Sequence, residues 1–223
     1  TVSTGMRATL YKLDLHPNDP TQYRFKDGFR KMEARQVTLA NGQAIDVYFS
    51  HYGPIVVHEN LVWDETTAYT VRDANLYNFQ AAESYHQMSQ ATDVHELIDA
   101  ISLGGVSWVN TIASDSKGNA MYADISTVPN VDAALIEECQ VGEQRWGRAK
   151  MIILDGSRPD CAWRDSSAAV VANTLPADKM PRLVRDDYVT NSNDSYWLSN
   201  PKAPLEGYSP IIGSEGTARS LRT

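Results

Sequence analysis

Short β-prone stretches separated by turn residues dominate the first third of the chain. Asn41-Gly42 is the strongest short signal for a hairpin turn, and it lies between two such stretches. Gly53-Pro54 breaks the chain before a further apolar run. The pattern predicts strands at residues 35–39, 44–49, 55–57 and 68–71.

The middle of the chain carries helical patterns. Asp93 followed by Glu96 resembles a capping box, which starts a helix. Apolar residues then recur at the spacing of one helical face, at Val94, Leu97, Ile98 and Ile101. Gly104-Gly105 is expected to end this helix. A weaker pattern predicts a second helix roughly over residues 78–88.

The second half of the chain is expected to have few regular elements. Residues 108–113 and 120–126 predict a hairpin around a polar turn at 115–119. Residues 129–180 contain repeated glycines and prolines and are interpreted as loop-rich. Because there is no regular alternation of strand and helix, the pattern predicts an α+β, β-rich chain.

Composition excludes some partners but identifies none. The chain has 223 residues, 42% of them hydrophobic, and a formal net charge of -8. Such a charge does not neutralise phosphates, so we expect neither nucleic acid nor an anionic membrane as a partner. No uninterrupted apolar run is long enough to span a bilayer.

Common catalytic and metal-binding motifs are missing from the sequence. It has no Gly-rich phosphate loop, no Cys-x-x-Cys, no His-Glu-x-x-His and no Gly-x-Ser-x-Gly. The histidines are not paired at helical ligand spacing, so we interpret them as solvated or structural; they are His16, His51, His58, His86 and His95. We therefore predict no metal site and no cofactor.

Three features leave alternatives open. The segment Asn191–Ser195 is either a polar turn or a set of amides and hydroxyls placed to meet a reacting carbonyl. Trp108 is either buried in a core strand or part of the wall of an apolar acyl pocket. Cys139 and Cys161 are either reduced thiols or a disulfide that closes a long loop.

Several stretches, taken in order along nearly the whole chain, resemble a known family. They are Thr1–Thr4, Thr9–Leu13, His51–Val56, Arg72–Leu76, Trp108–Thr111, Asp115–Tyr122, Cys161–Trp163 and Asn191–Leu198. Together they are similar to the β-subunit of acyl-homoserine lactone acylases and aculeacin acylases, within the penicillin acylase family. The resemblance implies an amide hydrolase whose nucleophile is the N-terminal Ser of a self-processed β-chain, and whose base is the α-amino group of that Ser.

The resemblance also implies that this chain is an internal fragment without the nucleophile. The family's N-terminal Ser and a nearby His match positions upstream of Thr1. Thr1-Val2-Ser3 matches the interior strand of the oxyanion hole and not the family's Ser-Asn start, so Thr1 is not expected to be the nucleophile. Gly5-Met6-Arg7 stand where calcium-binding relatives carry acidic residues, so we do not expect that metal site.

The resemblance assigns roles to individual positions of this sequence. The backbone N–H of Val2 and the side-chain amide of Asn193 match the two donors of the oxyanion hole. Arg219, or else Arg222, matches an Arg that helps to hold the site. The acyl pocket is implied to include Tyr85, Trp108, Val109 and Asn110. Cys139 and Cys161 match positions expected to form a disulfide.

At the level of the whole protein, the resemblance implies part of the four-layer αββα fold of N-terminal-nucleophile hydrolases. Strands of its core sheet would lie at both ends of residues 1–223, with an inserted lobe roughly over 20–180. The expected partners are an N-acyl small-molecule substrate, the α-subunit and the rest of the β-subunit, in the periplasm or outside the cell. The alternative hypotheses for the function are a β-lactam or lipopeptide acylase and a secreted, non-catalytic binding module.

Overall fold

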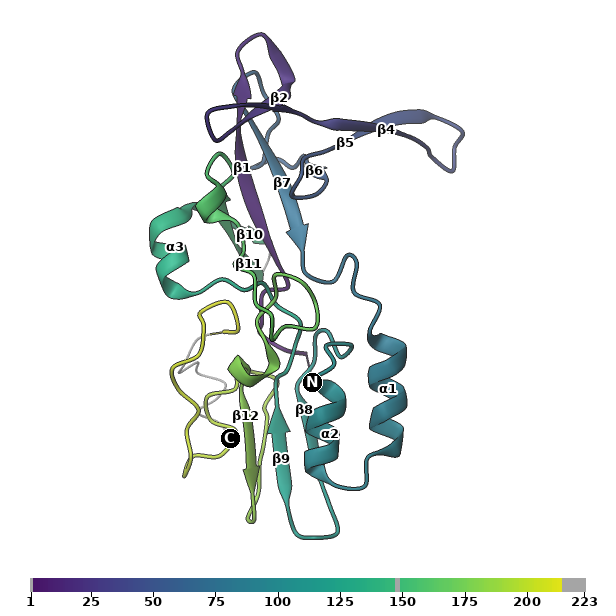
Figure 1. Cartoon of the computed structure of the whole chain (residues 1–223), viewed down its shortest axis with the longest axis vertical. Coiled ribbons are helices and arrows are strands. Elements are labelled where there is room, and N and C mark those ends of the chain that lie inside the picture. Colours follow the sequence, from purple (N-terminus) through teal and green to yellow (C-terminus); the bar gives the residue numbers. More distant parts are fainter. Residues whose placement is uncertain (1, 147–148, 214–223) are drawn as a thin grey trace. The chain divides into compact units, whose positions relative to one another are not determined.

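The computed structural model describes residues 2–146 and 149–213, and it is mixed α+β and rich in strands, as the sequence predicts (Figure 1). The chain divides into two compact units. Unit 1 comprises Thr1–Arg7, Ala74–Ala133 and Trp163–Thr223, and unit 2 comprises Ala8–Asp73 and Ala134–Ala162. The predicted division into core-sheet ends and a lobe over residues 20–180 stays a prediction.

Both units combine helices and strands. The elements of unit 2 are β1 (Ala8–His16), β2 (Asp19–Phe25), β3 (Gly28–Lys31), β4 (Glu33–Thr38), β5 (Ala44–Phe49), β6 (Ile55–Val56), β7 (Thr67–Asp73), α3 (Ala133–Cys139), β10 (Gln140–Trp146), β11 (Ala149–Asp155) and the 3-10 turn η1 (Pro159–Cys161). Those of unit 1 are α1 (Ala81–Gln90), α2 (Val94–Ile101), β8 (Thr111–Ser114), β9 (Ala120–Ala123), the 3-10 turn η2 (Ala177–Lys179) and β12 (Arg182–Arg185).

Strand β1 is the centre of the sheet in unit 2. It pairs with β11 in parallel and with β7 and β2 in antiparallel orientation, and Figure 1 shows β1 and β7 side by side. Leu10 is fully buried and packs with Leu61 and Ile153. The next residue, Tyr11, is also fully buried and stacks on Tyr52 with ring centroids 3.8 Å apart. Because successive side chains of a strand point to opposite faces, both faces of β1 are covered.

The hairpin of β4 and β5 confirms the two strands predicted around Asn41-Gly42. The side chain of Asn41 accepts a hydrogen bond from the N–H of Gln43 at 3.0 Å, and Gly42 has a φ of 83°. A positive φ is tolerated best by glycine, which explains the turn sequence. All the residues of β4 are exposed, so the hairpin forms from local turn chemistry without a buried face of its own.

The interpretation of residues 129–180 as loop-rich is wrong for much of that range. It contains α3, β10 and β11, and β10 pairs with β11 in antiparallel register. Gly142 does not break β10; it lies at the register shift of this pair. The apolar run at Met151–Leu154 extends the sheet beside β1, and burial there outweighs the local breakers.

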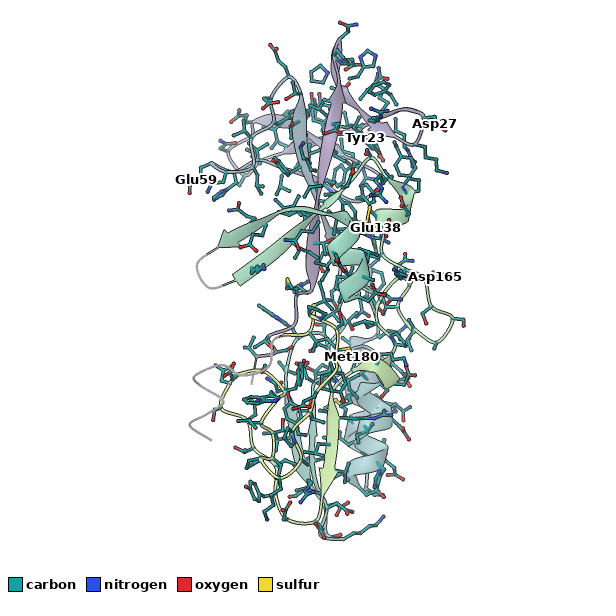
Figure 2. The ribbon with its side chains drawn as sticks, turned by 90° about the vertical axis from the view of Figure 1, so that its left-hand side faces the viewer. Tyr23, Asp27, Glu59, Glu138, Asp165 and Met180 are labelled. Carbon is teal, nitrogen blue, oxygen red and sulfur yellow. A yellow bond between two sulfur atoms is a disulfide. The ribbon has the colours of Figure 1, made fainter. Side chains whose placement is uncertain are left out.

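A disulfide joins Cys139, at the end of α3, to Cys161 in η1. Both residues are buried, and the bond is the yellow link near Glu138 in Figure 2. The chain between them includes the whole β10–β11 hairpin. The expected cystine is therefore confirmed, and it ties the hairpin's two connections together.

Loss of this disulfide should destabilise the protein by about 3 kcal/mol, because the crosslink reduces the entropy of the unfolded chain. The test is chemical unfolding of the complete protein with Cys139→Ala and Cys161→Ala combined. A reducing agent should bring the wild type close to the double variant and leave the variant unchanged. Two free thiols in the oxidised native protein would contradict the pairing.

Unit 1 contains a three-stranded antiparallel sheet in the order β12-β9-β8, accompanied by the helices α1 and α2 (Figure 1). The predicted start of α2 is confirmed, since the side chain of Asp93 accepts hydrogen bonds from the N–H groups of His95 and Glu96. Glu96 does not complete a capping box with Asp93; its carboxylate accepts from Thr92 instead. Helix α1 begins three residues later than predicted, because Asn78 bonds the N–H of Gln80 and the carbonyl of Gly104.

At Gly105, the loop after α2 lies in close contact with the start of α1. Its N–H donates to the Ser84 hydroxyl at 2.9 Å, and a Cβ at this position would lie 2.3 Å from the carbonyl oxygen of Gln80. No side chain fits there unless the backbone moves. Glycine is therefore required at position 105 by close backbone contact.

We expect Gly105→Ala to lower the free energy of unfolding by about 1–3 kcal/mol, the usual cost of overpacking. The matched control is Gly28→Ala, where no atom lies within 4 Å of the new Cβ. The measurement is the unfolding midpoint of the complete protein for both variants. Equal midpoints for the two variants would show that the contact with Gln80 relaxes without cost.

Among the residues that the structure describes, no helix is both long and apolar enough to cross a bilayer.

Candidate functional site

The segment at residues 2–6 runs beside Val109 in unit 1. Val2 and Val109 form an antiparallel bridge, and the N–H of Ser3 donates to the carbonyl of Trp108 at 3.3 Å. Because the bond comes from the N–H of Ser3 and not from that of Val2, Val2 and Val109 form a non-hydrogen-bonded antiparallel pair. The N–H of Val2 is therefore directed away from the Val109 strand, which is the orientation an oxyanion donor requires.

The same segment is also hydrogen-bonded to residues 211–212. The N–H of Met6 donates to the carbonyl of Ile211 at 2.7 Å, and the Thr4 hydroxyl donates to the carbonyl of Ile212 at 3.0 Å. Ile211 and Ile212 are fully buried. Hydrogen bonds to Trp108 and to residues 211–212 thus hold the segment that carries Val2.

A buried carboxyl group is hydrogen-bonded to the same segment. Asp124 is fully buried and accepts hydrogen bonds from the hydroxyls of Ser3 and Ser126, both at 2.6 Å. The Ser3 oxygen also accepts from the N–H of Gly5 at 2.9 Å. Burial raises the pKa of the Asp124 carboxyl, and the bonds from Ser126 and Ser3 oppose that shift only in part. Asp124 could not be recognised from the sequence, because a lone aspartate belongs to no motif.

The polar segment at 191–195 forms a turn with Asn193 at its exposed position. The side chain of Asn191 accepts from the N–H of Asn193 at 2.9 Å and donates to the carbonyl of Asp194 at 3.1 Å. Asn193 has a φ of 57°, a left-handed conformation that asparagine tolerates better than most residues. The polar-turn interpretation is thus confirmed, and a rigid turn is also what a fixed amide donor needs.

The Val2 segment and the Asn193 turn approach each other at Gly213. A Cβ at that glycine would lie 2.4 Å from the Thr4 hydroxyl and 3.5 Å from the Cβ of Ser195. Thr4 and Ser195 each stand two residues after a predicted oxyanion donor. The two predicted donors therefore belong to neighbouring segments of the same unit, although the sequence separates them widely.

Asn110 and Tyr122 are hydrogen-bonded in series to the segment that carries Val2. Asn110 is 5% exposed, and its amide donates to the carbonyl of Val2 at 3.0 Å, while its side-chain oxygen accepts from the Tyr122 hydroxyl at 2.7 Å. Tyr122 is fully buried on β9. Burial raises the pKa of its phenol, Asp124 and Asp194 raise it further, and a hydrogen bond with the Ser199 side chain acts in the opposite direction. The phenol thus stays protonated and donates to Asn110.

The residues predicted to line an acyl pocket are partly exposed. Trp108 is 46% exposed, so the alternative of a Trp buried in a core strand is wrong. Its indole lies 5.8 Å from the guanidinium of Arg7, a cation–π contact. Tyr85, on α1, is 58% exposed, and Val109 is 37% exposed. These side chains are available to an apolar ligand, and their substrate-binding role stays a prediction.

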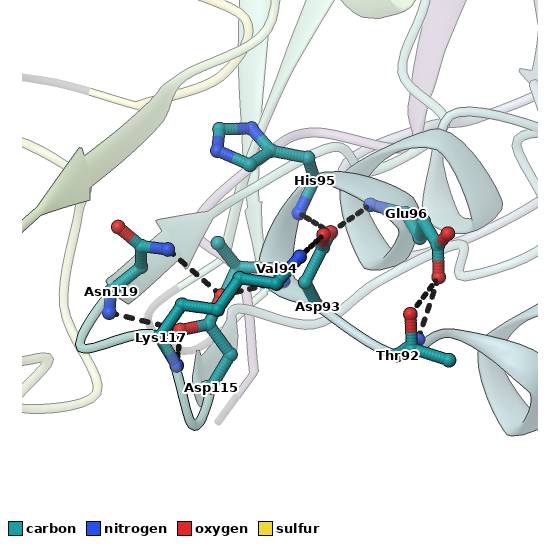
Figure 3. A network of polar contacts seen from close by, with 8 residues as sticks. All are labelled: Thr92, Asp93, Val94, His95, Glu96, Asp115, Lys117 and Asn119. Carbon is teal, nitrogen blue, oxygen red and sulfur yellow. Dashed lines mark hydrogen bonds and ion pairs between the residues drawn. The ribbon is translucent and has the colours of Figure 1, made fainter.

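Figure 3 shows the polar network that connects α2 to the β8–β9 turn. Lys117 forms an ion pair with Asp93 at 2.6 Å, and Asp115 accepts from the backbone N–H groups of Lys117 and Asn119 and from the Asn119 side chain. The side-chain bond from Asn119, followed by its backbone bond, lowers the pKa of Asp115 to about 2. The network is structural: it holds the hairpin that carries Tyr122 on β9.

The histidines are placed as structural or surface residues. His51 lies in an aromatic cluster, where its ring nitrogen is 2.8 Å from the Tyr23 hydroxyl. Burial first, and then the charges of Arg30 and Arg72, lower the pKa of His51 to about 4. His86 and His95 are exposed on their helices. Within residues 2–146 and 149–213, no three metal-binding side chains cluster as a metal site would require.

Arg219 and Arg222, the two candidates for the supporting arginine, lie outside the described residues. The structure therefore gives no position for this part of the predicted site.

The fold is similar to part of a solved penicillin acylase. It is similar to the thermostable penicillin G acylase from Alcaligenes faecalis, with a TM-score of 0.60 and 18% sequence identity over 93% of this chain and 34% of that one. The chain belongs to the penicillin amidase family, whose sequence profile matches residues 1–223.

Two named relatives are considerably closer in sequence. The chain is 39% identical over 226 residues to the acyl-homoserine lactone acylase PvdQ of Pseudomonas savastanoi pv. phaseolicola, covering 97% of this chain. It is 41% identical over 230 residues to the aculeacin-A acylase of Actinoplanes utahensis, covering 100% of this chain. In both cases the chain spans 29% of the relative's length.

Proposed function

We propose that this chain is part of an acylase that hydrolyses the amide bond of N-acyl compounds, with N-acyl-homoserine lactones as the preferred substrate class. Family membership supports amide hydrolysis, and relatives named as acyl-homoserine lactone acylases support the substrate class. The observation that carries the proposal is the geometry of Val2: its N–H is directed away from the Val109 strand, in a segment that meets the Asn193 turn at Gly213.

In the proposed reaction, the N-terminal Ser of the processed β-chain, which lies outside this sequence, attacks the amide carbonyl. Its own α-amino group takes the hydroxyl proton and gives it to the departing amine as the C–N bond breaks. An acyl-ester remains on the Ser. Water then attacks this ester and loses a proton to the α-amino group of the Ser. The α-amino group passes that proton to the Ser oxygen as the ester bond breaks, which releases the fatty acid and restores the Ser hydroxyl.

Val2 and Asn193 would act on the tetrahedral intermediate in both steps. The negative charge develops on the former carbonyl oxygen, and donors already aimed at that position stabilise it without reorganisation. The backbone N–H of Val2 is the first donor and the carboxamide of Asn193 is the second. Arg219, or Arg222, would help to hold the site.

The acyl chain would contact exposed apolar side chains of unit 1. Trp108, Val109 and Tyr85 supply the apolar area, and Asn110 borders the wall from its buried position. Apolar pockets with few polar groups suit long acyl chains. The expected partners of this chain are the N-acyl substrate, the α-subunit and the rest of the β-subunit.

We further propose that the whole protein is exported to the periplasm or secreted. The Cys139–Cys161 disulfide supports this, because such bonds persist in oxidising compartments.

The test is an acyl-chain-length activity profile of the complete processed protein. The proposal expects release of homoserine lactone from N-acyl-homoserine lactones, with the highest kcat/KM on long chains. A higher kcat/KM on a lipopeptide such as aculeacin A, or on penicillin G, would move the substrate assignment within the family. No amide hydrolysis on any of the three would favour a non-catalytic binding module.

A further inference from the structure

The peptide group between Val2 and Ser3 is held on both of its edges. Its carbonyl accepts from the Asn110 amide at 3.0 Å, and its N–H donates to the carbonyl of Trp108 at 3.3 Å. A peptide group is planar, so two opposed hydrogen bonds fix its orientation. This orientation in turn restricts the ψ angle of Val2 and the direction of the adjacent N–H.

Asn110 depends on Tyr122 for its own orientation. A side-chain amide can rotate so that oxygen and nitrogen exchange places, and its neighbours decide which arrangement is stable. The Tyr122 hydroxyl donates to the Asn110 oxygen at 2.7 Å, which leaves the nitrogen facing the carbonyl of Val2. Without that hydroxyl, the Asn110 oxygen loses a buried donor at 2.7 Å.

Tyr122 also has the position and rigidity that such a role needs. It stands on β9, the central strand of the three-stranded sheet, opposite Ile112 on β8 and Leu183 on β12. Its hydroxyl reaches the segment that carries Val2 through Asn110 alone, by two hydrogen bonds in series.

We propose that Tyr122 is a positioning residue of the oxyanion hole, which acts through Asn110 to align the N–H of Val2. The inference rests on the proposed function of Val2 and Asn193. Tyr122 does not touch the reacting atoms; it fixes the peptide group beside the donor. Because donors must be preorganised where the charge develops, a small misalignment lowers kcat more than it changes KM.

The kinetic test uses the complete protein and the variants Tyr122→Phe, Asn110→Ala and their combination. We expect Tyr122→Phe to lower kcat about tenfold with KM nearly unchanged, as for a modest loss of donor alignment. The double variant should match Asn110→Ala alone, since Tyr122 acts through Asn110. Unchanged kcat in Tyr122→Phe, or fully additive losses in the double variant, would overturn the proposal.

Tyr11→Phe is the matched control. Tyr11 is also fully buried, and its hydroxyl donates to the carbonyl of Cys161 within unit 2. This variant loses a buried hydroxyl without touching the site, so its kcat should equal that of the wild type.

Hydrogen exchange separates this proposal from the proposed function. Tyr122→Phe should increase deuterium uptake in residues 2–6, and Tyr11→Phe should not, whether or not the protein hydrolyses any substrate tested. Increased uptake in a protein without acylase activity would refute the proposed function and leave the structural role of Tyr122 intact. Unchanged uptake in Tyr122→Phe would refute the positioning role itself.

Discussion

Asn193→Ala should reduce the turnover of the complete acylase by about 10²–10³, the effect of removing one oxyanion donor from a preorganised site. KM should change little, since the carboxamide stabilises the charge that develops only in the transition state. The measurement is steady-state hydrolysis of a long-chain N-acyl-homoserine lactone. Turnover close to that of the wild type would remove Asn193 from the mechanism.

Two further substitutions separate the amide from the backbone of the turn. Asn193 has a φ of 57°, so alanine adds conformational strain to the loss of the donor. Asn193→Gly keeps the left-handed conformation and removes only the side chain, and it should lose as much turnover as Asn193→Ala. Asn173→Gly is the control, because Asn173 has a φ of 60° and lies outside the 191–200 loop. Its turnover should be unchanged.

Asp124→Ala should lower the free energy of unfolding by about 2–5 kcal/mol, because it leaves two buried hydroxyls without their acceptor. Those hydroxyls belong to Ser3 and Ser126, and Asp124 itself is fully buried. Thermal unfolding of the complete protein measures the effect. Asp186→Ala removes an exposed aspartate and should change the stability by no more than about 0.5 kcal/mol. Equal stabilities for the two variants would show that the Asp124 bonds contribute nothing net.

Asp124→Asn tests the charge state of the same group. The pKa of the Asp124 carboxyl is raised by burial, so its contribution to stability is complete below the unfolded pKa of about 4 and decreases as pH rises through the folded pKa. An asparagine does not ionise and has no such dependence. The difference in stability, Asp124→Asn minus wild type, should therefore become more favourable to the variant as pH rises above about 4. A difference that is constant with pH would show that the pKa is not raised.

Local sequence signals were reliable where neighbouring residues alone decide the structure. The Asn41-Gly42 hairpin, the Asp93 cap and the apolar stripe of α2 were predicted, because each depends on contacts within a few residues. The loop-rich interpretation of residues 129–180 was wrong because β11 is a strand by virtue of pairing with β1, a contact with a distant part of the sequence. The glycines and prolines in that range do not prevent helices and strands from forming there.

The candidate site divides in the same way. The Asn191–Ser195 turn and Tyr85 could be predicted as candidate site residues from residue types and from the family resemblance. Tyr122 and Asp124 could not, since a single tyrosine or aspartate has no pattern. Their importance depends on burial and on partners at distant positions, Asn110, Ser3 and Ser126.

The sequence by itself was enough to predict the family, the strand-rich fold class and several of the turns; the groups proposed to donate to an oxyanion stay a prediction. Only the tertiary structure decided which of these groups share a unit, how the amide of Val2 is directed, and that a buried phenol is connected to the Val2 carbonyl through Asn110. The reason is physical: turn and cap preferences are local energies that each short stretch carries with it. Burial and hydrogen bonding between distant segments arise only when the folded chain removes those groups from water.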